Sequence, residues 1–148
     1  MKMSSRGRYG LKAMIDIAFA AKNNEPVSLR GVALRQGIPE NYLEQLMIHI
    51  KKAGLVDSVR GAQGGYILKK SAGEISAGDI LRALEGSLSP VNCLDSEDAA
   101  CGTGDCSVCG AKTVWNRMYA GMNSAIDTIT LEELVRNYTV LKEGSACE

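Results

Sequence analysis

The chain has 148 residues, of which 45% are hydrophobic and 23% are charged, and its formal net charge at pH 7 is zero. These values are ordinary for a globular protein, so they exclude the disordered, collagen-like and disulfide-scaffold classes. The length suits one domain with a small appendage and excludes an enzyme with separate cofactor and substrate lobes. No apolar run approaches the roughly 18 residues that span a bilayer, and the N-terminus lacks the features of a signal peptide. We therefore expect a cytoplasmic protein without a membrane partner.

The charges are unevenly distributed along the chain. Residues 1–70 contain 12 Lys or Arg and 5 Asp or Glu, whereas residues 71–148 contain 5 and 12, so the net charges are +7 and −7. A basic part joined to an acidic part is typical of a protein that presents the first to a polyanion, and nucleic acid is the leading candidate. A chance distribution of solvated charges is the alternative at this point.

Three helices are predicted at the start of the chain. The first covers about 4–22, where apolar residues recur at helical spacing. A short second helix follows the N-cap Ser28 and ends at Gly37. The third covers 39–53, with Pro in its first turn and an apolar stripe. Two short helices joined by a tight turn that contains Gly are typical of a helix-turn-helix.

A β-hairpin is predicted next. Two strand-like runs, 55–59 and 66–68, are joined by a loop that contains three glycines. Glycine permits positive φ and close approach of two backbone segments, as a tight hairpin requires. The predicted order in this net-positive segment of about seventy residues is three helices followed by a hairpin. This is the order of a winged helix-turn-helix DNA-binding domain.

The rest of the chain is predicted to be helical around a central loop. A capping box at 76–79 begins a fourth helix, which ends at Gly86. Residues 93–109 show no period and are rich in Gly, Asp and Ala, so they form a loop. A long amphipathic helix covers about 113–127 and, standing alone, needs a partner. A second capping box begins a short last helix over about 130–138, followed by a loose tail.

The predicted fold class is mainly α with a small β-hairpin, that is, a winged helix-turn-helix followed by a long C-terminal helix. The predicted divisions are 1–90 for the winged helix-turn-helix DNA-binding domain, 91–111 for the cysteine-rich loop, and 112–148 for the long helix, the short last helix and the tail.

The third helix is the candidate recognition helix. If its apolar stripe packs inward, polar side chains that can read base edges remain on the outer face. Asn and Gln can pair with adenine, and Glu can accept from the amino group of cytosine. A merely solvated polar face is the alternative. The candidate side chains are Glu40, Asn41, Tyr42, Glu44 and Gln45.

The hairpin is the candidate wing. Arg60 stands at its base, and small residues at the tip suit insertion into a minor groove, whose negative potential favours Arg. The other candidate DNA-contacting residues are Arg8, Ser28, Gly61, Gln63 and Gly64.

Four of the five cysteines, Cys93, Cys101, Cys106 and Cys109, lie within 17 residues in the pattern C-x7-C-x4-C-x2-C. Such clustering in a reducing compartment favours metal or redox chemistry over structural disulfides. An iron-sulfur cluster needs four ligands and tolerates uneven spacing. Structural zinc sites usually contain two pairs of closely spaced cysteines, and this chain has one such pair, Cys106 and Cys109. A thiol switch, in which the closest pair of cysteines forms a reversible disulfide, is a third hypothesis. The spacing favours the iron-sulfur cluster but leaves the zinc site and the thiol switch open.

The sequence resembles the Rrf-two family of winged-helix transcription regulators and, within it, the iron-sulfur cluster assembly regulator branch. The resemblance rests on Ser-Arg-Gly-Arg-Tyr-Gly at 5–10, Tyr-Leu-Glu-Gln-Leu at 42–46, Arg-Gly at 60–61 and Gly-Gly-Tyr at 64–66. It covers nearly the whole chain.

The resemblance implies a cofactor. Cys93, Cys101 and Cys106 match the three cysteines of the cluster-binding branch, although the gaps between them differ. Cys109 follows three residues after the last of them, where the best-known member of the branch has a His. An all-cysteine iron-sulfur cluster is therefore implied, 2Fe-2S in the first place and 4Fe-4S as the alternative.

The resemblance also implies partners. It implies a homodimer that binds a double-stranded DNA operator as a repressor, in which the helix over 113–127 pairs with its twofold mate and Glu44 helps to discriminate between operators. Residues 76–91 look equally like a cysteine-metabolism repressor of the same family, which lacks a cluster and binds a biosynthetic enzyme. The four cysteines favour the cluster branch.

Two other functions are kept as alternatives. The chain could be a cluster-free regulator of sulfur metabolism that uses zinc or a thiol switch, with a protein partner from that metabolism. It could be a small iron-sulfur electron carrier, although a carrier needs no basic winged part. An enzyme is not expected, because the sequence contains no nucleophile–base pair, phosphate loop or catalytic His constellation.

Overall fold

The computed structural model describes residues 2–96 and 106–146. The helices and strands are, in chain order, α1 (Ser5–Ala20), α2 (Leu29–Gln36), α3 (Glu40–Lys52), β1 (Val56–Val59), β2 (Gly65–Leu68), η1 (Ala72–Glu74), α4 (Ala77–Glu85), η2 (Asn92–Leu94), η3 (Cys106–Val108), α5 (Lys112–Thr128) and α6 (Leu131–Ala146). The mainly helical fold with a small hairpin is the predicted one.

The predicted capping residues begin their helices. Ser28 accepts the backbone N–H of Gly31 at 3.1 Å at the start of α2, and this helix ends at Gly37 with φ of 64°. Ser76 and Asp79 form the capping box of α4, with reciprocal hydrogen bonds of 3.0 and 2.9 Å. Local sequence therefore determines where these helices begin.

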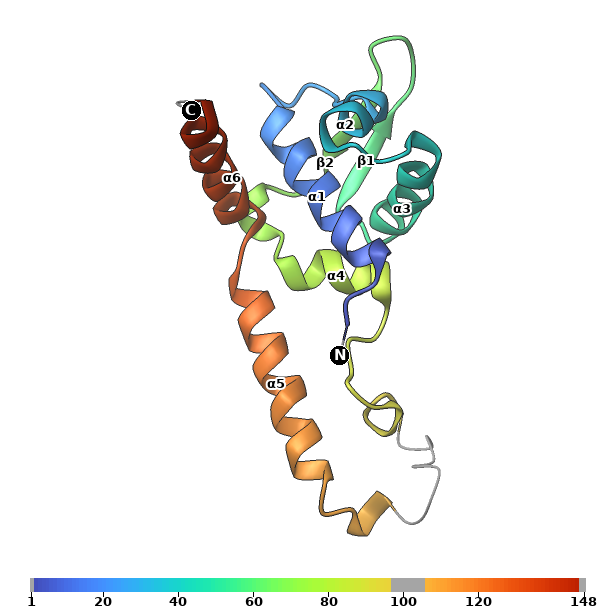
Figure 1. The fold of residues 1–148 in the computed structure, drawn as a ribbon. Helices are drawn as coiled ribbons and strands as arrows, with labels where there is room; N and C mark the ends of the chain where they lie inside the picture. Colours follow the sequence, from blue (N-terminus) through green and yellow to red (C-terminus); the bar gives the residue numbers. More distant parts are fainter. Residues whose placement is uncertain (1, 97–105, 147–148) are drawn as a thin grey trace.

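Helices α1 to α4 and the hairpin share one hydrophobic core (Figure 1). The two strands pair antiparallel, from Val56 opposite Leu68 to Val59 opposite Gly65. An isolated bridge between Val27 and Tyr66 ties the segment before α2 to the hairpin. This arrangement is the winged helix-turn-helix that the order of elements predicts, and it fixes α3 and the hairpin relative to each other.

Helix α6 departs from the prediction. A short helix ending near Tyr138 with a loose tail was expected, but α6 runs to Ala146 and packs against α1. The side chain of Leu131 is fully buried in the shared core. Farther along, the Tyr138 ring packs edge-to-face on Phe19 at 5.1 Å, and Lys142 Nζ lies 5.2 Å from the Phe19 ring centroid. These contacts with α1 stabilise the extra turns, so the expectation of a loose tail is wrong.

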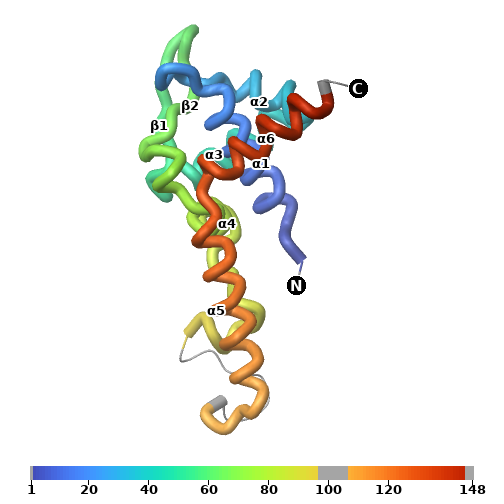
Figure 2. Tube along the Cα trace, turned by 90° about the vertical axis from the view of Figure 1, so that its left-hand side faces the viewer, coloured from blue at the N-terminus to red at the C-terminus, as the bar shows by residue number. Residues whose placement is uncertain are grey.

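Helix α5 extends away from the core in both views (Figures 1 and 2). None of its 17 residues is buried. Arg82 of α4 holds its C-terminal part, donating to Asp127 Oδ1 at 2.6 Å and to Asn123 Oδ1 at 3.1 Å. Among the described residues, no helix is long and apolar enough to cross a membrane.

Candidate nucleic-acid interface and cysteine segment

Helix α3 is held by four buried apolar side chains, Leu43, Leu46, Met47 and Ile50. The opposite side of the helix is exposed to solvent and carries the predicted base-reading residues Glu40, Asn41, Glu44 and Gln45. The amphipathic arrangement inferred from the sequence is thus the observed one.

Tyr42 lies differently from the rest of the predicted set. Its side chain is half-buried and packs edge-to-face on Tyr9 of α1, with 5.9 Å between the ring centroids. Arg8, also predicted to contact DNA, is exposed and lies 5.7 Å from the Tyr9 ring centroid. The two tyrosines therefore connect the start of α3 to the basic N-terminal turns of α1.

An ionic network centred on a buried carboxylate, which the sequence reasoning missed, connects α1 to α2. Asp16 of α1 is fully buried, and Arg35 of α2 donates to it from Nε at 3.1 and 3.0 Å and from Nη2 at 2.7 Å. The hydrogen bond with Asp16 raises the pKa of Arg35 above its ordinary value. The signal that could have found this network is an acid between the apolar residues Ile15 and Ile17 of α1, because a buried carboxylate needs a partner.

The same network reaches the C-terminal helix. Gln36 Nε2 donates to Asp16 Oδ1 at 3.0 Å and to the Tyr138 hydroxyl at 3.2 Å. The position of the first helix of the helix-turn-helix therefore depends on α1 and on α6.

The wing loop projects beyond the core at the end of the hairpin (Figures 1 and 2). Arg60, Gly61 and Gln63 are exposed there, and Gly61 has a φ of 113°. A Cβ on Gly64 would lie 2.2 Å from the Val59 carbonyl oxygen, so this position accepts only glycine. The glycines thus allow the tight turn that the sequence predicted.

Two exposed polar contacts lie close to the candidate interface. Lys51 Nζ, near the end of α3, donates to Ser58 Oγ of β1 at 2.6 Å. Ser28 is exposed and uses its hydroxyl as the cap of α2. Helix α3 and the hairpin are therefore joined directly as well as through the core.

The cysteine segment is only partly within the described residues. Cys93 lies in η2 and Cys109 lies three residues before the start of α5, and both residues are half-buried and outside any disulfide. Cys106 lies in η3, but its side chain is outside the described part, as is all of Cys101. Within that part, no three His, Cys, Asp or Glu side chains lie close enough to hold a metal ion. Both described pieces lie at the end of the molecule where α5 begins (Figure 1).

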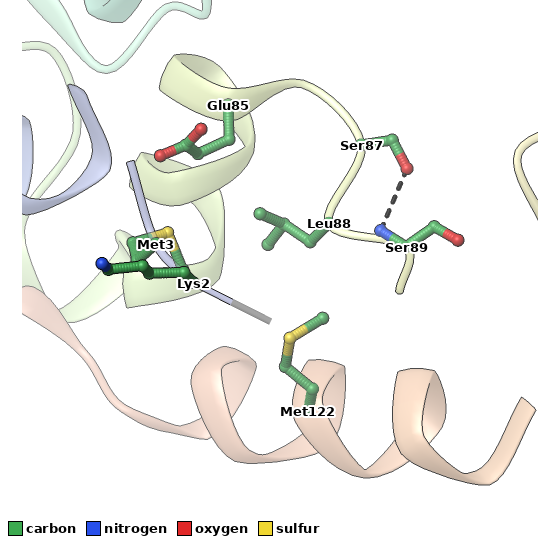
Figure 3. Close-up of a pocket in the computed structure, with 7 residues that line it drawn as sticks. All are labelled: Lys2, Met3, Glu85, Ser87, Leu88, Ser89 and Met122. Carbon is green, nitrogen blue, oxygen red and sulfur yellow. Dashed lines mark hydrogen bonds between the residues drawn. The ribbon is translucent and has the colours of Figure 1, made fainter. Parts of the chain in front are cut away.

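A small half-open pocket lies between the start of the chain, the end of α4 and α5 (Figure 3). Glu85 on its wall accepts the Gly7 N–H at 3.0 Å and the hydroxyl of Ser4, so it caps α1. The pocket is lined by Lys2, Met3, Glu85, Ser87, Leu88, Ser89 and Met122. The segment that leads to Cys93 therefore leaves α4 at a junction with α1 and α5.

Comparison with known proteins identifies the family. The Rrf2 family, described as "Iron-dependent Transcriptional regulator", matches residues 3–137. The HTH-type transcriptional regulator CymR of Bacillus subtilis is 42% identical over 94% of this chain and 92% of its own length. The HTH-type transcriptional regulator IscR of Pectobacterium carotovorum is 41% identical over 95% of this chain and 83% of its own length.

A solved structure gives the same result. CymR (YrzC), titled the global cysteine regulator of B. subtilis, superposes with a TM-score of 0.76 at 38% identity, covering 93% of this chain and 98% of that one. These relatives are named as transcription regulators rather than enzymes, and the near-equal identities to CymR and IscR do not distinguish their modes of sensing. The chain belongs to the Rrf2 (Rrf-two) family of winged-helix transcription regulators.

Proposed function

We propose that the chain is a dimeric repressor whose affinity for its operator depends on an iron-sulfur cluster. Each subunit places α3 in a major groove and the wing over the adjacent minor groove. Because the two subunits are related by a twofold axis, the half-sites lie about one helical turn, or roughly 34 Å, apart.

The observation that carries the DNA-binding mode is the outer face of α3. Asn41, Glu44 and Gln45 are exposed there, opposite four side chains that fix the helix to the core. A helix that only contacted phosphates would carry more Lys and Arg on this face, whereas amide and carboxylate groups suit base edges. The positive charge of the exposed Arg60 in the wing supplies an electrostatic contact that does not depend on base sequence.

Two substitutions test this mode. Arg60→Ala is expected to weaken binding to all DNA sequences, whereas Glu44→Ala is expected to change the preference among operators. The measurement is a gel-shift panel of operator variants. Arg136→Ala and Glu132→Ala are the controls, because both side chains are exposed on α6. The docking proposal fails if Arg60→Ala changes the operator affinities no more than Arg136→Ala does, and Glu44→Ala no more than Glu132→Ala does.

The homodimer is supported by α5, which has no buried residue. Val114 and Met118 expose 52% and 45% of their surfaces. An amphipathic helix with its apolar side in water needs a partner surface, and a second copy of the same helix provides one across a twofold axis.

The sensor proposal uses the four clustered cysteines. Four thiols form a donor set that fits an iron-sulfur cluster, and Cys93, Cys101, Cys106 and Cys109 would hold it, as 2Fe-2S in the first place and 4Fe-4S as the alternative. The cluster would supply reversible redox and iron-dependent chemistry at this segment. Arg82 joins α4 to α5, so a change in the segment between these helices alters how α5 is held against the DNA-binding part.

The test is anaerobic purification followed by iron, sulfide and zinc analysis and a visible absorption spectrum. We expect iron and sulfide in the wild-type protein and their loss in the double variant Cys106→Ser, Cys109→Ser. Cys147→Ser is the matched control, because Cys147 lies outside the cluster of four. Zinc without iron, or a colourless protein that is active on DNA, would overturn the cluster in favour of the zinc or thiol-switch reading. An unchanged spectrum in the double variant would remove these two cysteines as ligands.

A further inference from the structure

Ile48 is an apolar side chain on the polar side of the recognition helix. It is 65% exposed, although it is flanked in sequence by the fully buried Met47. The four side chains that anchor α3 occupy the opposite side of the helix. Ile48 therefore contributes nothing to the core, and its identity is not explained by folding.

The position of Ile48 on the helix is specific. It follows Asn41 by seven residues, Glu44 by four and Gln45 by three, and these spacings place all four on one face of the helix. All four side chains are exposed. Single exposed apolar residues are common on protein surfaces. What sets Ile48 apart is its place in line with the three polar side chains proposed to read bases.

The major groove limits what an isoleucine could contact there. Its base edges present hydrogen-bond donors and acceptors, together with one apolar group, the 5-methyl of thymine. Isoleucine has no hydrogen-bonding group, so over any other base edge it would displace water without replacing its hydrogen bonds. A thymine methyl is the group in the groove that an exposed isoleucine complements.

We propose that Ile48 is a specificity-determining residue that selects thymine, through its 5-methyl group, at one position of each operator half-site. The inference rests on the proposed function, because it requires α3 to lie in the major groove. It extends the proposed function by naming the base, thymine, and the chemical group, its 5-methyl, that Ile48 recognises.

The experiment removes the methyl group and the side chain in turn. Operators are first selected from random DNA with the anaerobically purified wild-type protein. Each thymine of a half-site is then replaced by deoxyuridine, which lacks only the methyl, and affinity is measured for wild type, Ile48→Ala and Val140→Ala. Val140 is the matched control, since it is also 65% exposed but lies on α6.

We expect one replacement in each half-site to weaken wild-type binding by about fourfold, the effect of one buried methyl. We expect the same replacement to weaken binding equally in Val140→Ala and to have no effect on binding in Ile48→Ala. If no replacement weakens wild-type binding, or if the loss persists in Ile48→Ala, the inference is wrong while the proposed function stands. If selection enriches no sequence at all, the proposed function itself has failed. Thermal unfolding of Ile48→Ala checks that the variant is folded.

Discussion

Helices α1 and α5 have almost the same length, 16 and 17 residues, but opposite surroundings. Six residues of α1 are buried, whereas none of α5 is. α1 packs against α2, α3, α4 and α6, so it forms the centre of the winged-helix part. The difference shows that one part of the chain is specified by its own core and that the other leaves apolar surface for a partner.

Close backbone approach accounts for much of the packing of α1. A Cβ on Gly10 would lie 2.1 Å from Leu84 Cδ1, so glycine at this position lets α4 pack tightly across α1. On α5, by contrast, Gly121 has open space around it. We therefore expect the two regions to respond differently to substitution.

The largest effect is expected in the shared core. Leu46 is 1% exposed and Leu34 is 77% exposed, so the same substitution to Ala can be compared at both positions. Leu46→Ala should lower the free energy of unfolding by about 4 kcal/mol, because it removes buried contacts and leaves a cavity. Leu34→Ala should change it by less than about 0.5 kcal/mol. Urea unfolding measures both, and similar values for the two variants would contradict the assigned core.

A somewhat smaller effect is expected for the ionic network. Arg35→Ala leaves the carboxylate of Asp16 buried with Gln36 as its remaining partner. The Asp16 side chain is fully buried but that of Arg35 is 38% exposed, so water can replace part of the lost interaction and stability should fall by about 1–2 kcal/mol. Arg30→Ala, an exposed arginine on the same helix, is the control. Equal denaturation midpoints for the two variants would show that the network does not hold α2.

On α5 the effect is expected in self-association. Met118→Lys places a charge on the exposed apolar side and should raise the dissociation constant of the dimer by at least about tenfold. Asn116→Lys is the control, because a residue two positions away lies on the opposite side of a helix. Sedimentation equilibrium measures both constants. A wild-type protein that stays monomeric, or equal constants for the two variants, would refute pairing through this face.

The smallest effect is expected at the exposed turn η1. Hydrogen bonds from the Ser71 hydroxyl and N–H lower the pKa of Glu74 below its ordinary value of 4.5. A carboxyl whose folded pKa is depressed stabilises the fold above its ordinary pKa, and that contribution is lost as the pH falls through the folded pKa. In Ser71→Ala, the pKa of Glu74 followed by NMR titration should rise toward the ordinary value. An unchanged titration would show that the capping box does not persist in solution.

The parts of the fold that follow from local pattern were predictable from the sequence. Ser28 and Ser76 cap the helices they were expected to cap, and the apolar stripe of α3 is the buried one. Both features depend on residues a few positions apart, which the sequence displays directly.

Features that depend on distant contacts were not predictable in this way. Helix α6 continues past Tyr138 because Phe19 of α1 provides a packing surface. Tyr42 likewise packs on an aromatic ring of α1, that of Tyr9. The Asp16–Arg35 pair joins residues 19 positions apart. The spacing of the four cysteines predicts the donor set of the proposed cluster. The geometry of that set includes Cys101, which lies outside the described residues.

The most direct test of the account compares the affinity of iron-loaded and cluster-stripped protein for one selected operator, measured anaerobically by fluorescence anisotropy. Linkage between two sites typically amounts to about 5- to 150-fold, and we expect a difference in this range. Cys106→Ser, Cys109→Ser should bind like the stripped protein under both conditions. Equal affinity of the loaded and stripped wild-type protein would contradict the claim that the cysteine segment controls the winged helix.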